Sequence, residues 1–239
     1  INISDAIKKD GVGESIGSID DHNSSAFSAE NMALFQDGIY ISINNGIDLK
    51  ESIQFIHIAN QDQARDSRIF QRIFIKIGKS SRANFLYHEI GDNNNKHFIN
   101  SVIEILVQEN AQLTWNNLQK WNLFSGQVSS CNFSIKKDAT VLYNTYDFGS
   151  GFLRRNINTY LNGSNGNFEM NSLLLPDNSQ HLDVFSKVEN QKENVCFVLA
   201  QKGDEQEAVV CSHKKNLALL LRELFFLLDF FLLHFQESC

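Results

Sequence analysis

The sequence predicts a large all-β domain followed by a helical segment near its C-terminal end. About a dozen short runs rich in β-branched and aromatic residues follow one another from residue 39 onward, with turn-forming residues between them. No helical pattern separates these runs, which excludes a doubly wound α/β sheet. Residues 217–235 form a nearly continuous stretch of leucine and phenylalanine with helical spacing. We therefore expect one β-rich unit and a distinct terminal helix.

The first 37 residues predict an N-terminal segment of helix and loop. Ser24 and Ser25 can cap a short helix that runs to Phe35, and Asp37 with Gly38 would end it. Residues 39–43 are then predicted to form the first strand, which stops at the turn-forming residues 44–46.

The later strands are predicted from the alternation of apolar and polar residues. Ile73, Ile75 and Ile77 would lie on one face of their strand, and Phe74 and Lys76 on the other. The expected strands are residues 53–58, 69–77, 83–90, 98–107, 112–118, 131–135, 140–146, 155–161, 167–175, 181–188 and 196–200. A sandwich, a barrel or a β-solenoid could contain such a series. The sequence shows no strict short repeat, which would have favoured a regular solenoid outright.

Composition narrows the class of protein. The 239 residues are enough for one large domain with small appendages. A net charge of -7, from 21 basic and 28 acidic residues, argues against a nucleic-acid-binding surface. The four cysteines are widely spaced and include no Cys-x-x-Cys pair, which favours a reducing compartment over a disulfide framework. Residues 1–5 lack the pattern of a signal peptide, so we expect a cytoplasmic protein.

The apolar stretch at residues 217–235 is the one candidate for a membrane span. It contains Arg222, Glu223 and Asp229 near its middle, and each would cost about 2.5–3.5 kcal/mol at the centre of a bilayer. We therefore predict a packed or partner-binding helix and no membrane insertion.

Cys211 and His213 are the candidate metal ligands. A thiol and an imidazole two residues apart share one side of a strand, and both are suitable ligands for iron, copper or zinc. Two groups cannot complete a metal site, so further ligands must come from elsewhere in the chain or from another chain. The alternative is a buried cysteine followed by a surface histidine at the end of a strand.

The other cysteines predict no second ligand set. Cys196 lies in an apolar run and is expected in the core, and Cys131 and Cys239 have no nearby partner ligands. His181 and Asp183 have the spacing of two ligands but lack a third group, so we expect them to form a hydrogen-bonded pair.

A resemblance to a known family rests on short motifs that occur in order between about residue 25 and residue 203. The stretch from Phe27 to Phe35, with Asp37 and Gly38 after it, resembles the opening helix and first strand of the SufB/SufD family of iron–sulfur cluster assembly proteins. The similarity is greater to SufD than to SufB. The further matching positions are Asn100, Glu104, Ile105, Asn110, Ala111, Leu118, Gln119, Gly149, Arg154, Gly163, Asp183, Val188, Lys202 and Gly203.

The resemblance implies both a fold and a function. It implies a right-handed parallel β-helix core over residues 38–210, between an N-terminal segment (1–37) and a C-terminal helical segment (211–239). It implies a non-enzymatic scaffold subunit that pairs with a SufB-like subunit and binds a SufC-like ATPase through the C-terminal helices. Cys211 and His213 would then serve cluster assembly, with iron or an iron–sulfur cluster held transiently and shared with the partner.

The chain departs from the family pattern near these residues. Residues 204–210 alone separate Gly203 from Cys211, where the family has further β-helix turns, and Lys214 and Asn190 replace a glycine and a histidine. Two other functions stay open: a purely structural interaction protein, and a carbohydrate-acting β-helix enzyme. Such an enzyme needs clustered carboxylates. The candidate carboxylates are scattered in the sequence: Glu104, Glu109, Asp138 and Asp147.

Overall fold

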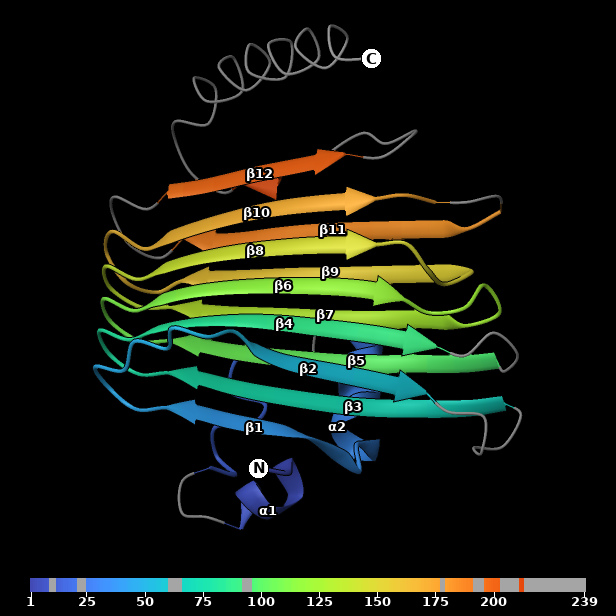
Figure 1. Ribbon diagram of the computed structural model, residues 1–239, viewed down its shortest axis with the longest axis horizontal. Coiled ribbons are helices and arrows are strands. Elements are labelled where there is room, and N and C mark those ends of the chain that lie inside the picture. The colour runs from blue at the N-terminus through green and yellow to red at the C-terminus, as the bar shows by residue number, and fades with distance from the viewer. Residues whose placement is uncertain are drawn as a thin grey trace, which may run out of the picture.

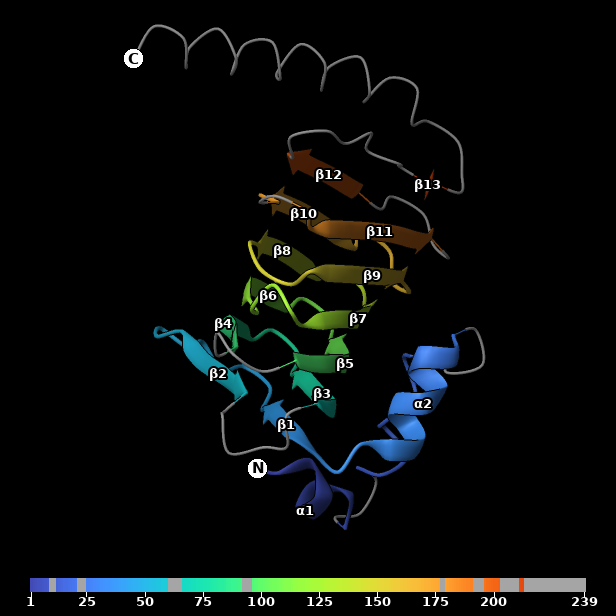
Figure 2. The ribbon, with the colours of Figure 1, turned by 90° about the vertical axis from the view of Figure 1, so that its right-hand side faces the viewer.

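The chain folds into a parallel β-solenoid made of two sheets that face each other (Figures 1 and 2). The computed structural model describes residues 1–8, 12–20, 25–59, 66–91, 96–176, 179–190, 196–202 and 211–212. Odd-numbered strands form a seven-stranded sheet in the order β1-β3-β5-β7-β9-β11-β13, and even-numbered strands form a six-stranded sheet in the order β12-β10-β8-β6-β4-β2. Successive strands therefore alternate between the sheets, and each turn of the chain adds one strand to each sheet.

The strands are long and regular through the middle of the solenoid. Their bounds are β1 Asp37–Ile43, β2 Ile53–Ala59, β3 Asp66–Ile77, β4 Arg82–Gly91, β5 Lys96–Val107, β6 Gln112–Lys120, β7 Gly126–Ile135, β8 Thr140–Asp147, β9 Phe152–Leu161, β10 Asn167–Leu174, β11 His181–Asn190, β12 Cys196–Lys202 and β13 Cys211–Ser212. The predicted β-solenoid is confirmed, and each strand expected from the sequence corresponds to one of β1 to β12.

Two short helices precede the strands. The expected helix is α2 (Ala26–Leu34), and Ser25 is its N-cap, with a side chain that accepts a hydrogen bond from the Ser28 amide. α1 (Ile3–Ile7) was not expected from the sequence. Gly38 does not end α2 as predicted but lies in β1, where a Cβ atom would sit 1.8 Å from the Arg72 carbonyl oxygen. Glycine is needed there because two backbones approach closely.

A turn with one left-handed residue recurs along the solenoid. These residues are Gly46, Ser80, Asn110, Asp138 and Asn165, each with φ between 53° and 73°. The amide of Ser80 donates to the carbonyl of Glu109 at 2.9 Å, and Asn110 and Asp138 make the same bond to Lys137 and Ser164. The spacing between these positions shortens from turn to turn. The repeat is therefore structural without being strictly periodic, so the sequence shows no fixed short repeat.

The interior of the solenoid has an apolar part and a polar part. Ile77, Val107 and Ile135 are paired in register from strand to strand and are fully buried. Ile73, Ile75 and Ile77 all belong to this core, as the alternation predicted. Near the ends of β4 and β8 the buried residues are polar or charged, and they include Glu89 and Asp147.

The N-terminal residues cover part of one outer face of the solenoid. α2 and the N-terminal residues lie over the outer face of the odd-numbered sheet, where Phe74 packs against Ile3 and Ile16 (Figure 2). In the part of the chain that the structure describes, α2 is the longest helix, with nine residues, and no helix is long and apolar enough to span a membrane. The predicted helical segment at 211–239 lies outside the described residues except for Cys211 and Ser212.

Candidate functional site

Cys211 lies in the last strand of the odd-numbered sheet. β13 pairs in parallel with β11, so that Cys211 is next to Lys187 and Ser212 is next to Val188. Lys187 is exposed, and Val188 is buried in the core. His213, the second predicted ligand, lies outside the described residues, and its pairing with Cys211 stays a prediction.

A groove of about 780 Å³ lies on the outer face of this sheet and reaches Lys187. Its floor is formed by side chains of β7, β9 and β11, including Ser130 and Asn158. Its wall is formed by the end of the segment of residues 12–20, which we call the N-terminal strap, and by the start of α2. The groove therefore extends from the N-terminal strap to Lys187, the register neighbour of Cys211.

A column of polar residues runs under the groove from strand to strand. The register places Glu104, Asn132, Asn158, Lys187 and Cys211 at consecutive neighbouring positions of β5, β7, β9, β11 and β13. The Asn158 amide donates to Asn132 Oδ1 at 2.8 Å. Asn132 is itself fully buried, and its amide donates to Asp20 Oδ1 at 3.3 Å. These two hydrogen bonds connect Asn158 through Asn132 to Asp20 of the strap.

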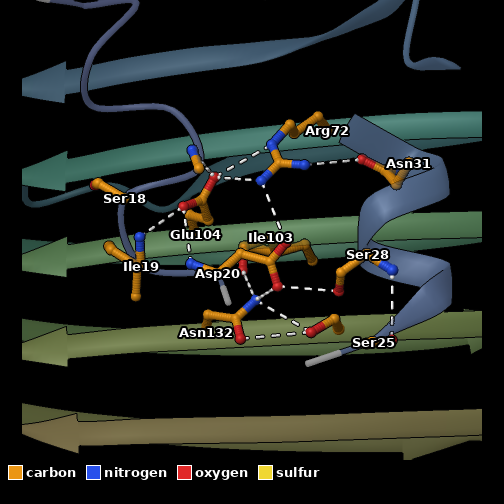
Figure 3. Close-up of polar contacts among 12 residues, drawn as sticks. Ser18, Ile19, Asp20, Ser25, Ser28, Asn31, Arg72, Ile103, Glu104 and Asn132 are labelled. Carbon is orange, nitrogen blue, oxygen red and sulfur yellow. Dashed lines mark hydrogen bonds and ion pairs between the residues drawn. The ribbon is translucent and has the colours of Figure 1, made fainter. Parts of the chain in front are cut away.

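Glu104 anchors the N-terminal strap to the sheet (Figure 3). Its carboxylate accepts hydrogen bonds from the backbone amides of Gly17, at 2.8 Å, and of Ile19, at 2.9 Å. It accepts another from the Asp20 amide at 3.1 Å and one from Arg72 Nη2 at 2.9 Å. A buried carboxylate that accepts several charge-assisted hydrogen bonds is strongly held. The strap is therefore a fixed wall of the groove.

Arg72 joins the strap to α2. It is completely buried, and it donates to Asp20 at 3.3 Å and to Asn31 of α2 at 3.2 Å, in addition to Glu104. Burial raises the pKa of Asp20 above its usual value, although the Arg72 charge opposes this shift. Arg72 and Asp20 were not predicted from the sequence, since their partners lie far apart in the chain.

A second group of charges is buried inside the solenoid. Arg155 Nη2 lies 2.6 Å from Asp147 Oδ1 and 3.9 Å from Glu89 Oε2. The amides of Asn117 and Gln127 donate to Glu89, at 3.0 and 2.6 Å. Burial alone would lower the pKa of Arg155, but the nearby groups, Asp147 foremost, raise it above its usual value. The arginine therefore stays charged and is the counter-charge that lies next to Asp147 and close to Glu89.

A signal for Arg155 was present in the sequence. Arg155 occupies the same alternating face of β9 as Leu153 and Ile157, which are buried. A charged residue at an inward position of an apolar strand requires a buried partner.

The candidate carboxylates of a carbohydrate-acting enzyme each have another partner. Glu104 and Asp147 are buried and ion-paired with Arg72 and Arg155. Glu109 pairs with Lys79 at 3.0 Å, and Asp138 lies in a turn where it accepts from the Asn165 amide. Glu104 and Asp147 are fully buried in these ion pairs, which counts against either as an acid–base residue.

The predicted hydrogen-bonded pair of His181 and Asp183 is wrong. The His181 ring stacks on Phe152, with ring centroids 5.7 Å apart, and Asp183 pairs with Arg154 at 2.7 Å. Over the described ranges, no three histidine, cysteine or acidic side chains are grouped in a way that could hold a metal ion.

Cys131 is buried in the core beside Tyr143, and burial raises the pKa of its thiol to about 12. The thiolate is the reactive form of cysteine. Cys131 should therefore resist iodoacetamide at pH 8 in the folded protein and react once urea unfolds it. Mass spectrometry of the peptide that contains Cys131 measures both rates. Equal rates in the two states would contradict the burial described here.

The fold and the site define a β-solenoid protein whose buried charges are paired and whose cysteine-bearing strand lies at one end of a sheet. The chain belongs to the family described as SUF system FeS cluster assembly, SufBD core domain, whose profile matches residues 57–203. The resemblance seen in the sequence is thereby confirmed.

Two curated relatives of the chain are named as iron–sulfur cluster assembly proteins. The chain is 24% identical over 161 residues to the iron-sulfur cluster assembly protein SufD of Escherichia coli (strain K12). This alignment covers 67% of the chain and 38% of the relative. The chain is 24% identical over 216 residues to an iron-sulfur cluster assembly SufBD family protein of Synechocystis sp. (strain ATCC 27184 / PCC 6803 / Kazusa), covering 84% and 44%. The chain therefore spans about two fifths of the length of these relatives.

Proposed function

We propose that the chain is a non-enzymatic subunit of an iron–sulfur cluster assembly scaffold of the SufBCD type. The observation that supports this function most strongly is that the family match covers the solenoid from β2 to β12. The four widely spaced cysteines are suited to a reducing cytoplasm, where the scaffold would act.

The proposed cluster site contains Cys211 and His213. Iron or a nascent cluster is the cargo of this site, held transiently and shared with a SufB-like subunit that supplies the remaining ligands. The position of β13 supports sharing, because among the described strands it pairs on one side alone, with β11. A thiolate next to an imidazole is suited to iron or to persulfide sulfur.

A SufC-like ATPase would bind the C-terminal helical segment, residues 211–239. The support is the composition of residues 217–235, whose apolar side chains extend around more than one face of a helix and require a partner to cover them. Movement of the ATPase during its cycle would then open or close the shared site.

Co-expression with a SufB-like subunit and a SufC-like ATPase tests the proposal. We expect one complex that contains all three chains, measured by native mass spectrometry. Replacing Leu224 and Leu228 with aspartate should release the ATPase and retain the SufB-like subunit. The control is Phe124→Asp, at a side chain of the solenoid that is 64% exposed, and it should leave the complex intact. Isolation of the chain without either partner would contradict the proposal.

A further inference from the structure

A row of flat side chains crosses the outer face of the odd-numbered sheet near the starts of its strands. The register places Arg68, Phe98, Gly126, Phe152 and His181 at consecutive neighbouring positions of β3, β5, β7, β9 and β11. Paired residues of neighbouring strands project from the same face at intervals of about 4.8 Å. The Arg68 guanidinium lies 5.6 Å from the Phe98 ring centroid, and the Phe152 and His181 rings are stacked at 5.7 Å. Gly126 therefore interrupts a row of stacked groups.

The backbone does not require glycine at position 126. Gly126 lacks the positive φ that favours glycine, and a Cβ atom there would lie 3.6 Å from Phe98 Cδ2 and 4.0 Å from the Phe152 carbonyl oxygen, which are ordinary contact distances. The two phenylalanines are two strand spacings apart, about 9.6 Å. A ring halfway between them would be about 4.8 Å from each, within the range of about 4.5–7 Å at which aromatic rings pack. The gap over Gly126 therefore has room for one ring.

The gap is part of a hollow of about 330 Å³ in the surface of the sheet. The residues that line this hollow include Arg68, Lys96, Phe98, Phe124 and Gly126. Aromatic side chains around it are open to solvent: Phe124 is 64% exposed, and Phe152 is 40% exposed. Phe27 of α2, which packs against Phe98, is 42% exposed. Exposed aromatic side chains that gather in this way are typical of a surface that binds a partner.

Hydrogen bonds fix the walls of the hollow. The His97 amide donates to Ser125 Oγ at 3.2 Å, which links β5 to the turn before β7. In this turn Asn122 Oδ1 accepts from the Phe124 amide at 2.9 Å and from the Ser125 hydroxyl at 3.0 Å. A site that is already formed binds its ligand with a smaller loss of conformational entropy.

The charge of the hollow selects its ligand. Arg68 and Lys96 line it, and none of the described residues in its lining is acidic, although the chain has a net charge of -7. Arg68 is ion-paired with Glu30 of α2, whereas Lys96 is exposed at the start of β5. An aromatic group next to negative charges is therefore complementary to the hollow.

We propose that the hollow binds an aromatic side chain of a partner protein, with acidic residues on either side of it in the partner's sequence. The ring enters the gap between Phe98 and Phe152, and the acidic groups lie near Lys96. A volume of about 330 Å³ is at the lower end of the range for small-molecule sites, about 300–1,000 Å³, and is suited to a single anchoring side chain. The proposal uses no residue of the segment 211–239, so it is independent of the cluster-assembly function.

Nuclear magnetic resonance titration of the isotope-labelled full chain tests the proposal. The probes are the peptide Asp-Glu-Trp-Glu-Asp, its alanine counterpart Asp-Glu-Ala-Glu-Asp, and adenosine monophosphate, which also combines a ring with an anion. We expect saturable shifts of the Gly126 amide with the tryptophan peptide and none with the other two probes. An equal response to both peptides, or saturation by the nucleotide in place of the tryptophan peptide, would overturn the proposal.

Filling the gap provides a second test. Gly126→Phe should raise the urea midpoint of unfolding, because the new ring stacks on Phe98 and Phe152, and it should weaken binding of the tryptophan peptide by about tenfold or more. Lower stability of this variant would show that the chain needs glycine there, and unchanged affinity would show that the ring binds elsewhere. Either result would refute the proposal.

The charged residue at the hollow has a matched control. Lys96→Gln should weaken binding of the tryptophan peptide by about two- to fivefold, as expected of an exposed ion pair. Lys120→Gln, at an exposed lysine at the end of β6 that does not line the hollow, should bind as the wild type does. Equal effects of the two lysine variants would contradict the placement of the acidic groups near Lys96.

Discussion

Replacing Arg155 with methionine should lower the free energy of unfolding by about 3–5 kcal/mol, which is the usual cost of removing one partner from a buried ion pair. Arg155 is completely buried, and its guanidinium lies 2.6 Å from Asp147 and 3.9 Å from Glu89. Without the guanidinium, both carboxylates would stay in the interior without a counter-charge. Urea unfolding followed by circular dichroism measures the change.

Arg154 is a matched control for this prediction. It is the adjacent residue in β9 and pairs with Asp183 at the surface, where both side chains are partly exposed. Arg154→Met should change stability by less than about 1 kcal/mol, as expected of an exposed ion pair. Adding Glu89→Gln and Asp147→Asn to the Arg155 variant should recover stability, because no buried charge then lacks a partner. Equal effects of the two arginine variants would contradict the role of the buried cluster.

Replacing Glu104 with glutamine should release the N-terminal strap and lower the free energy of unfolding by about 3 kcal/mol. The carboxylate accepts from three backbone amides and from Arg72, and the glutamine amide group would add donors where donors already converge. Amide hydrogen exchange should therefore accelerate at Gly17, Ile19 and Asp20, while exchange in β7 and β9 stays slow.

Glu30→Gln is the control for the strap. Glu30 lies on α2 and forms an ion pair with Arg68, and both side chains are partly exposed. Its replacement should leave exchange in the strap unchanged. Protection of residues 17–20 that persists in the Glu104 variant would show that packing of the strap, rather than this carboxylate, holds the segment.

The strands could be predicted from the sequence because alternation is a local signal. The pattern around Ile73, Ile75 and Ile77 assigned faces that the structure confirms. The choice between a sandwich and a solenoid depends on which strands pair, and alternation contains no information on pairing. The repeat that distinguishes a solenoid was concealed by the unequal spacing of residues such as Ser80 and Asn110. The family resemblance supplied this choice.

The site was predictable in part. Cys211 was proposed as a ligand from its chemistry and stays a prediction, and the register places its backbone beside Lys187. The strap was not predicted, since Glu104 and its partners near residue 20 are more than 80 residues apart. Arg155 could have been noticed as a charge at an inward position, but the identity of its partners required the fold.

The most direct test of the proposed function is the iron content of the complex formed with the SufB-like subunit and the SufC-like ATPase. We expect Cys211→Ala and His213→Ala each to lower the iron bound per complex without changing its mass. Ser212→Ala, between them, should bind as much iron as the wild type. Assembled complexes of both variants with normal iron content and normal cluster delivery would contradict the assignment of Cys211 and His213.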